Sequence, residues 1–440
     1  MGSSSNSNNN NINNNINNKE MKDEYGELTS EGETFVKHDF VLENGFVLPF
    51  VQLRYQTYGT LNDARDNVLV VCHALTGNAS LHSWWGNLLG DHKAFDTSKY
   101  FIVCCNILGS CYGSTNPQSI NPKTGIPYGK DFPNVSVRDT VQLQLLLLKE
   151  ELQVRSIRSV IGGSFGGMQA MEFAVLEGSS CANTLSEKHN NHNNNHNNNH
   201  HNPATTTTTP TAAECYVRSV IPIACGAMHT AWQIAISEVQ RQVIYADPLW
   251  NDDPFLATKG LDVARQMAMI SYRTPQGYQT KFGRSIQETS YSYQKEEHEE
   301  RSGGDPQQSQ QQQQPNHHAC YGKETFWQVK SYLENQGSKF VDRFDPITYV
   351  RLTEQMDSHD LARNRGVSSV SEVLSTIQIP MCVLGIDSDV LYPLSEQEEI
   401  ATHVPNSELW VIHSEEGHDG FLLEQEQVAR HIIDFLDRQQ

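Results

Sequence analysis

The sequence predicts an α/β protein of the doubly wound type, with a mostly parallel sheet that carries helices on both faces. The first observation that indicates this fold is the run Val68–Cys72, which is continuously apolar and rich in β-branched residues. Such a run is typical of a strand buried on both faces. Such runs recur along the chain and alternate with helical patterns, the order that βαβ units require. The other runs are Tyr100–Cys105, Ser159–Gly162, Val217–Ile223, Ile379–Ile386 and Leu409–Ile412.

The helical patterns between these strands follow in order. Asp139–Glu151 spaces its leucines for one buried face, and Met168–Leu176 follows a glycine-rich turn. Residues 229–370 differ, because they are polar and helical in pattern and contain no long β-branched run. We therefore expect them to form an inserted helical lid over the carboxyl ends of the strands, where open α/β sheets bind ligands.

Three segments have too few apolar residues to join a core. Residues 1–20 are Asn-rich, 186–212 are rich in Asn, His and Thr, and 295–318 contain a Gln run. We expect all three to be disordered, including the histidines of the second segment, which are predicted to belong to a surface-loop insertion. The predicted organisation is an α/β core of residues 35–228 and 371–440, with the lid of residues 229–370 between them.

Composition excludes several function classes. The chain has 440 residues, 32 of them basic and 52 acidic, for a net charge of −20, which disfavours nucleic acid and anionic membranes as partners. No apolar stretch reaches the roughly 18 residues of a membrane-spanning helix. The nine cysteines are odd in number and lack metal-ligand spacing, so we expect reduced thiols, no metal site and a cytoplasmic protein.

The run Gly162-Gly163-Ser164-Phe165-Gly166 matches the G-x-S-x-G nucleophile elbow. In that motif the serine sits on a sharp turn between a strand and a helix, and its neighbours must be small so that the backbones can approach. The predicted strand Ser159–Gly162 and helix Met168–Leu176 supply this context. The sequence therefore predicts an α/β-hydrolase fold in which Ser164 is a nucleophile that forms an acyl-enzyme.

A serine nucleophile needs a histidine base and an acid that orients the histidine. In this fold the order along the chain is Ser, Asp or Glu, then His. Position alone leaves Asp387 and Asp389 both open as the acid, after the strand Ile379–Ile386. His418, in a Gly-His-Asp-Gly loop near the C-terminus, is the predicted base; the competitor His413 directly follows a buried run and is expected to be structural.

The oxyanion of an acyl-transfer intermediate is expected to bind two backbone N–H groups. One is that of Phe165, directly after the serine, and the other comes from the loop after an earlier strand. That loop is His73–Gly77, in which Leu75 is the predicted donor. The alternative for this loop is an ordinary turn that ends in glycine.

With these residues identified, the chain resembles the homoserine O-acetyltransferase family of the α/β hydrolases, its MetX-like branch. The likeness covers nearly all of the globular chain, and the Asn-Ile-Leu-Gly-Ser-Cys-Tyr-Gly-Ser-Thr run is far more specific than the elbow. The segments that carry it are, in chain order, Tyr55–Asn62, His73–Gly77, Asn106–Thr115, Ser119–Pro122, Gly162–Gln169, Glu238–Gln242, Gly260–Arg265, Lys339–Asp345, Gly385–Asp389 and Gly417–Glu424.

The resemblance implies roles for further residues. The family pattern Ser-Asp-x-Leu-Phe/Tyr-Pro favours Asp389 as the acid of the triad. Arg265 matches an arginine that pairs with the substrate carboxylate, and Tyr272 matches a tyrosine two helical turns farther along the same helix. Asp419 matches a residue that receives the substrate amino group. The role of Arg241 stays undecided: it either supports the pocket or simply forms an ion pair. Phe165 stands where the family usually has Met, a small departure because the backbone N–H is the group required.

The activity that the resemblance implies is transfer of an acetyl group from acetyl-CoA to L-homoserine, a step of methionine biosynthesis, through an acyl-serine in a ping-pong reaction. It implies acetyl-CoA as a co-substrate, no bound cofactor, and a homodimer formed through the lid. Close alternatives are serine as acceptor or succinyl-CoA as donor. An esterase or deacetylase, which would use water, and an inactive binding module are the more distant ones.

Overall fold

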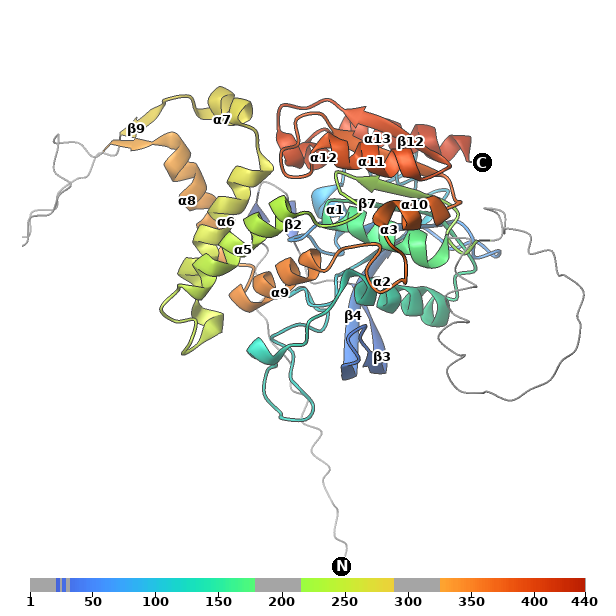
Figure 1. Ribbon diagram of the computed structural model, residues 1–440, viewed down its shortest axis with the longest axis horizontal. Helices are drawn as coiled ribbons and strands as arrows, with labels where there is room; N and C mark the ends of the chain where they lie inside the picture. The colour runs from blue at the N-terminus through green and yellow to red at the C-terminus, as the bar shows by residue number, and fades with distance from the viewer. Residues whose placement is uncertain (1–20, 24–25, 29–31, 179–214, 289–324, 440) are drawn as a thin grey trace, which may run out of the picture.

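The computed structural model describes residues 21–23, 26–28, 32–178, 215–288 and 325–439, and it is built around an eight-stranded sheet (Figure 1). The strand order is β12-β11-β8-β7-β5-β6-β4-β3. Strands β5 to β8, β11 and β12 pair in parallel, whereas β4 pairs antiparallel with both β3 and β6. The predicted, mostly parallel sheet is therefore confirmed.

The strands of this sheet are β3 (Glu33–Val41), β4 (Val47–Tyr58), β5 (Val68–Cys72), β6 (Phe101–Cys105), β7 (Ile157–Gly163), β8 (Val220–Ile223), β11 (Met381–Ile386) and β12 (Ser407–Ile412). Every residue of β5, β8 and β11 is buried, so these strands are covered on both faces, as their apolar composition predicts. Two further antiparallel pairs join β1 (Met21–Asp23) to β2 (Gly26–Leu28) and β9 (Ile286–Glu288) to β10 (Thr325–Trp327).

Helices surround the central sheet. Helix α2 (Val137–Leu146) begins at a capping box, in which the Ser136 hydroxyl accepts from the Asp139 N–H and the Asp139 carboxylate accepts from the Ser136 N–H. A π-helical stretch, Leu147–Glu151, ends this helical segment. The helices of this part are α1 (Leu81–Trp84), α2 (Val137–Leu146), α3 (Phe165–Glu177), α10 (Val370–Thr376), α11 (Leu394–His403), α12 (Gly420–Leu423) and α13 (Gln425–Arg438), with 3₁₀ turns at Gly129–Asp131 and Gly417–Asp419.

The segment between β8 and α10 forms a separate group of helices beside the sheet, drawn in yellow-green to orange in Figure 1. Helix α6 packs against both α5 and α8, and α9 packs against α5. The elements are α5 (Ala231–Tyr245), a 3₁₀ turn at Pro254–Leu256, α6 (Thr258–Tyr272), α7 (Pro275–Phe282), α8 (Gln328–Val341) and α9 (Pro346–Asp357). We call this group the lid; the exact domain boundaries stay a prediction.

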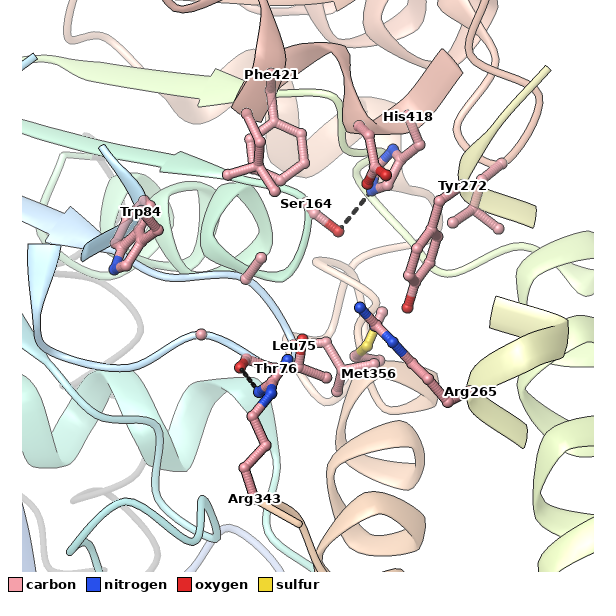
Figure 2. A pocket seen from close by; sticks show the side chains of 15 residues that line it. Leu75, Thr76, Trp84, Ser164, Arg265, Tyr272, Arg343, Met356, His418 and Phe421 are labelled. Carbon is pink, nitrogen blue, oxygen red and sulfur yellow. Dashed lines mark hydrogen bonds between the residues drawn. The ribbon is translucent and has the colours of Figure 1, made fainter. Parts of the chain in front are cut away.

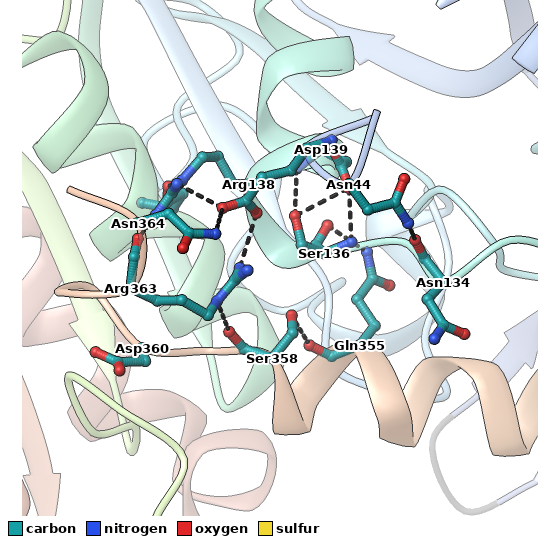
Figure 3. Close-up of polar contacts among 12 residues, drawn as sticks. Asn44, Asn134, Ser136, Arg138, Asp139, Gln355, Ser358, Asp360, Arg363 and Asn364 are labelled. Atoms are coloured by element: carbon teal, nitrogen blue, oxygen red, sulfur yellow. Dashed lines mark hydrogen bonds and ion pairs between the residues drawn. The ribbon is translucent and has the colours of Figure 1, made fainter. Parts of the chain in front are cut away.

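A network of buried and partly buried charged side chains holds the chain where it returns from the lid to the core (Figure 3). Arg138 of α2 donates to Glu43 and to Glu172, both at 2.7 Å. Arg363, which follows α9, donates to the same Glu43 at 2.8 Å. The Arg138 guanidinium opposes the effect of burial on Glu43 and leaves the pKa of this carboxyl below its ordinary value. The network therefore connects the end of the lid to α2 and to the turn between β3 and β4.

Some predicted boundaries were wrong by a few residues. The strand predicted at Val217–Ile223 begins at Val220, because Val217 forms only an isolated bridge with Ile157. The helix predicted from Met168 begins at Phe165, immediately after the elbow serine. The predictions for residues 1–20, 186–212 and 295–318 concern segments outside the described residues. Within the described part, no helix is long and apolar enough to cross a membrane.

Candidate active site

Ser164 joins β7 to α3 in a left-handed backbone conformation. Its φ of 56° and ψ of −122° are strained for a residue with a side chain. Two glycines make the turn possible. A methyl group on Gly162 would collide with the backbone of Gly166, and one on Gly166 would collide with the carbonyl group of Cys72. Close packing of β7, α3 and β5 thus imposes the sharp turn of a nucleophile elbow.

The structure brings the predicted serine, histidine and one of the two candidate acids together. His418 Nε2 lies 2.8 Å from Ser164 Oγ, and His418 Nδ1 lies 2.6 Å from Asp389 Oδ2. The other oxygen of Asp389 accepts the backbone N–H groups of Leu391 at 2.8 Å and Tyr392 at 2.9 Å. The carboxylate is thus oriented on one side by the backbone and on the other by the histidine.

The two competing residues form a second, separate pair. His413 Nδ1 lies 2.8 Å from Asp387 Oδ2, and these side chains are 78% and 40% exposed. The side chains of His418 and Asp389 are only 3% and 0% exposed. Of the two acids that position along the chain left open, Asp389 contacts the histidine that reaches Ser164, and Asp387 contacts His413.

His418 is placed in an environment that favours its protonated form. Burial opposes a positive charge on the ring, but the adjacent Asp389 carboxylate overcomes this effect and raises the pKa of His418 above its ordinary value. The Asp419 carboxylate acts in the same direction. A histidine of this kind accepts a proton from a hydroxyl and is stabilised once it carries the charge.

The two predicted oxyanion donors lie next to the serine and its pocket. Phe165 is the first residue of α3, so its N–H is one of those that a helix leaves without an intrahelical acceptor. Leu75 lines the pocket that contains Ser164. Its loop is braced by His73, whose ring contacts Ala74 O and accepts the N–H of Ile107 at 3.1 Å. Burial lowers the pKa of His73 to about 4, so the ring is neutral.

Ser164 opens into a cleft between the sheet and the lid. In Figure 2 the Ser164 hydroxyl faces His418, and the guanidinium groups of Arg265 and Arg343 point toward the middle of the cleft. Its lining is otherwise mostly apolar. The lining residues are Ala74, Leu75, Thr76, Gly77, Trp84, Ser164, Arg265, Tyr272, Arg343, Met356, Leu391, His418, Asp419, Phe421 and Leu422.

The three residues that the resemblance assigned to the substrate all line this cleft. Arg265 and Asp419 are 2% and 3% exposed, so both charges are shielded from solvent. The Arg265 guanidinium lies 5.8 Å from the ring centre of Tyr272 and 5.0 Å from that of Phe340. The Tyr272 ring in turn lies 6.0 Å from that of His418. Burial raises the pKa of Tyr272, so its hydroxyl stays protonated.

Two arginines of the site were missed by the sequence reasoning. Arg273 Nε lies 2.8 Å from Asp419 Oδ2, and the same arginine also pairs with Glu416. Arg343 donates to Thr76 O at 3.0 Å and to the Tyr112 hydroxyl at 2.7 Å, and so supports the loop that carries Leu75. Arg343 belongs to Lys339–Asp345, a segment that carries the family resemblance. This membership was the one sequence signal that could have identified Arg343 as a site residue. Arg273 directly follows Tyr272, but nothing in the sequence indicated its partner.

Arg241, left open from the sequence, does not line the cleft. It pairs with Asp357 at 2.6 Å and with Glu238 at 2.9 Å. The part of the chain that the structure describes contains no group of three or more His, Cys, Asp or Glu side chains that could hold a metal ion. The His-rich tract lies outside that part.

A strained serine between a parallel strand and a helix, bonded to a buried His–Asp pair, defines a serine-dependent enzyme site of the α/β-hydrolase type. Comparison with known proteins supports this class, since the family profile of the alpha/beta hydrolase fold matches residues 67–200. The chain also superposes on the crystal structure of a homoserine O-acetyltransferase from Bacillus anthracis, with a TM-score of 0.70 and 22% identity over 92% of this chain and 97% of that one. It superposes on esterase E22 with a TM-score of 0.68 and 20% identity, over 92% and 99% of the two chains. At these identities the structures establish the fold alone.

Sequence relatives identify the family. A homoserine O-acetyltransferase of Trichormus variabilis is 39% identical over 90% of this chain and 91% of its own length. The one of Salinibacter ruber is 41% identical over 89% and 94%, and that of Saccharomyces cerevisiae is 36% identical over 90% and 85%. The chain therefore belongs to the homoserine O-acetyltransferase family.

Proposed function

We propose that this protein transfers the acetyl group of acetyl-CoA to the hydroxyl group of L-homoserine, forming O-acetyl-L-homoserine and free CoA. The product would enter methionine biosynthesis. The observation that carries the proposal is the composition of one buried cleft, in which a serine bonded to a His–Asp pair shares the space with a buried arginine and a buried aspartate. The family to which the chain belongs supports the same reaction.

In the first half-reaction Ser164 Oγ attacks the thioester carbon while His418 Nε2 takes the hydroxyl proton. Asp389 holds the imidazole ring and stabilises its positive charge. The N–H groups of Phe165 and Leu75 bind the oxyanion of the tetrahedral intermediate. When the intermediate collapses, the C–S bond breaks and the CoA sulfur leaves as a thiol with the proton from His418. Ser164 is left acetylated.

In the second half-reaction the homoserine hydroxyl attacks the acetyl carbon, and His418 takes the proton from that hydroxyl. The intermediate then releases O-acetylhomoserine, and the proton returns from His418 to Ser164 Oγ. Water must not replace the acceptor in this step. The lid helices and the apolar lining of the cleft support its exclusion, because little of this surface offers a water molecule hydrogen-bond partners.

Arg265 and Asp419 are proposed to hold the two charged ends of the acceptor. A guanidinium binds a carboxylate through two parallel hydrogen bonds. A carboxylate has about four acceptor positions, so Asp419 can receive an ammonium group in addition to the guanidinium of Arg273. Tyr272, which lies between Arg265 and His418, is proposed to direct the acceptor hydroxyl toward the histidine.

Replacing Arg265 by alanine is expected to raise the KM for homoserine by about 10- to 100-fold, the equivalent of one charge-assisted hydrogen-bonded pair. The rate at which acetyl-CoA acetylates Ser164 should stay within about threefold of wild type. Steady-state kinetics gives the first quantity and rapid mixing with acetyl-CoA alone gives the second. Arg284→Ala, at an exposed arginine of the same lid, is the matched control and should change neither. Equal damage to both half-reactions in Arg265→Ala would refute the proposed role.

The experiment that tests the function compares acceptors and donors directly. Purified protein is mixed with acetyl-CoA or succinyl-CoA and with homoserine, serine or water, and thiol release is followed. We expect acetyl-CoA with homoserine to give a rate at least about 100-fold above that with water, since the acceptor site is built for a zwitterion. Faster release with serine or with succinyl-CoA would move the assignment to that substrate. Release with water at the same rate as with homoserine would identify an esterase.

We also propose that two copies of the chain associate through their lids. Two lid helices expose apolar side chains seven residues apart, Trp232 and Val239 on α5 and Val263 and Ile270 on α6, each between 43% and 55% exposed. Such stripes are typical of helices that pack against a partner. Sedimentation equilibrium distinguishes a dimer from a 49.5 kDa monomer. We place the protein in the cytoplasm from its cysteine usage, which cell fractionation can check.

A further inference from the structure

The loop that carries the triad acid is held by the first residues of the lid. We call residues 387–393 the acid loop and residues 228–233 the lid entry. Trp232 Nε1 of the lid entry donates to Val390 O at 2.8 Å, and Gln233 Nε2 donates to Leu391 O at 2.8 Å. Both accepting carbonyl groups belong to the acid loop. The backbone next to Asp389 is therefore fixed by lid side chains and not only by the sheet.

A third contact is part of a longer buried chain. His229 Nε2 of the lid entry lies 3.0 Å from the hydroxyl oxygen of Tyr392, and His229 Nδ1 lies 2.9 Å from Asp357 Oδ1 at the end of α9. With Nδ1–H donated to the carboxylate, the ring accepts the tyrosine O–H at Nε2. Asp357 Oδ2 pairs with Arg241 of α5 at 2.6 Å. The His229 side chain is 1% exposed and that of Arg241 6%.

Tyr392 is the point where this chain meets the triad. Its backbone N–H donates to Asp389 Oδ1 at 2.9 Å. Its ring lies against the imidazole of His418, with ring centres 5.0 Å apart and planes inclined by 31°. Tyr392 is completely buried, and burial raises the pKa of its hydroxyl, which stays a donor. A displaced Tyr392 would therefore disturb the acid and the base together.

We propose that His229 and Tyr392 are positioning residues. Through them, the position of the lid on the core determines how well Asp389 and His418 are aligned. The chain from Arg241 through Asp357 and His229 to Tyr392 works as one unit, which we call the lid latch. It touches no reacting atom and acts only through the triad. The inference rests on the proposed roles of Ser164, Asp389 and His418, but not on the identity of the acyl donor or acceptor.

The test uses a reagent that reports on the triad alone. The full-length protein is reacted with a fluorophosphonate, which labels an activated serine, and the rate is measured from pH 5.5 to 9. The final extent of labelling counts the active sites, so misfolded protein lowers the extent and not the rate per site. The variants are Tyr392→Phe, which keeps the ring and the backbone N–H, His229→Gln, and the double variant. Labelling proceeds whether or not homoserine is the acceptor, so a failed transferase assay leaves this test valid.

Each single variant is expected to label about fivefold more slowly per active site, the equivalent of one hydrogen bond of roughly 1 kcal/mol. The rate falls at low pH as His418 becomes protonated. The carboxylates that raise the pKa of His418 are those of Asp389 and Asp419, and the neighbouring hydroxyl groups of Tyr272 and Tyr392 stay neutral. The Arg265 guanidinium lines the same cleft, on the far side of the Tyr272 ring. If Asp389 is less well placed, its effect on His418 weakens while that of burial persists. The pKa of His418 then decreases, and the acid limb of the profile moves to lower pH.

The double variant should be no slower than the slower single variant, because the two residues belong to one unit. The matched control is His359→Gln, which removes another buried imidazole near the lid entry. His359 Nε2 contacts Gly226 O at 3.0 Å. The control should lower the melting temperature but leave the rate per site and the acid limb unchanged. Three results would each overturn the proposal. They are wild-type rates in both single variants, an acid limb that does not move, and a loss in the double variant that equals the product of the two single losses.

Discussion

Replacing Ser164 by alanine is expected to lower acyl transfer by at least about 10⁴-fold, the loss seen when a serine nucleophile is removed and only binding and oxyanion stabilisation remain. Alanine keeps the β-carbon and removes only the hydroxyl, so no acetyl adduct can form at this position. The measurement is CoA release with homoserine, together with mass spectrometry of the peptide that contains residue 164. Retention of more than about 1% of the activity would show that another group carries the acyl chemistry.

A second variant at the same position separates function from stability. Ser164→Gly is also expected to be inactive, but glycine adopts the φ of 56° without strain. We expect it to be more stable than Ser164→Ala by roughly 1 kcal/mol in urea unfolding. The pair therefore shows whether the protein holds a strained serine for the sake of its chemistry. Glycine that is less stable than alanine would contradict this explanation.

The second large effect is expected at Asp389. Changing it to asparagine should reduce kcat by about 10⁴-fold, because the amide no longer fixes the tautomer of His418 or stabilises its positive charge. Asp389 is buried and bonded to His418 at 2.6 Å. The loss should be present in both half-reactions, since the same base works in each.

Asp387→Asn is the matched control, two residues away in the same loop. Its partner His413 is largely exposed, and surface pairs of this kind contribute roughly 0 to 1 kcal/mol. We expect kcat within about twofold of wild type and a small change in melting temperature. The kcat values of the two variants, measured under identical conditions, decide between the acids. Equal losses, or a larger loss in Asp387→Asn, would reject Asp389 as the acid that orients His418.

The parts of the fold that the sequence predicted well are those set by local pattern. Val68–Cys72 is apolar at every position, a composition typical of a strand covered on both faces, and all five of its residues are buried. Strand β3, at one edge of the sheet, and its neighbour β4 were not recognised. In Glu33–Val41 the residues are mostly exposed, with two buried positions, so the apolar signal is weak. The antiparallel pairing of β4 with β6 is decided by contacts between distant segments.

The residues of the candidate site likewise divide into those set by a local motif and those set by contacts between distant segments. Ser164, His418 and Phe165 could be predicted because each lies in a short motif whose backbone geometry is local. The choice between Asp387 and Asp389 needed either the family pattern or the structure, since both acids follow the same strand. The contact of Arg273 with Asp419 joins segments far apart in the chain, and no periodicity indicates it. The lid latch is hidden for the same reason, because His229, Asp357 and Tyr392 come from three separate segments.

The central claim is that Ser164 carries an acetyl group from acetyl-CoA to homoserine. The most direct test is a two-step mixing experiment followed by mass spectrometry. Protein is first mixed with acetyl-CoA alone, and the acetylated enzyme is then mixed with homoserine or with buffer. We predict an acetyl group on Ser164 that disappears at least about 100-fold faster with homoserine than with buffer, with one O-acetylhomoserine formed per acetyl group lost. An adduct that decays at the same rate in both solutions, or transfer without any adduct on Ser164, would contradict the account.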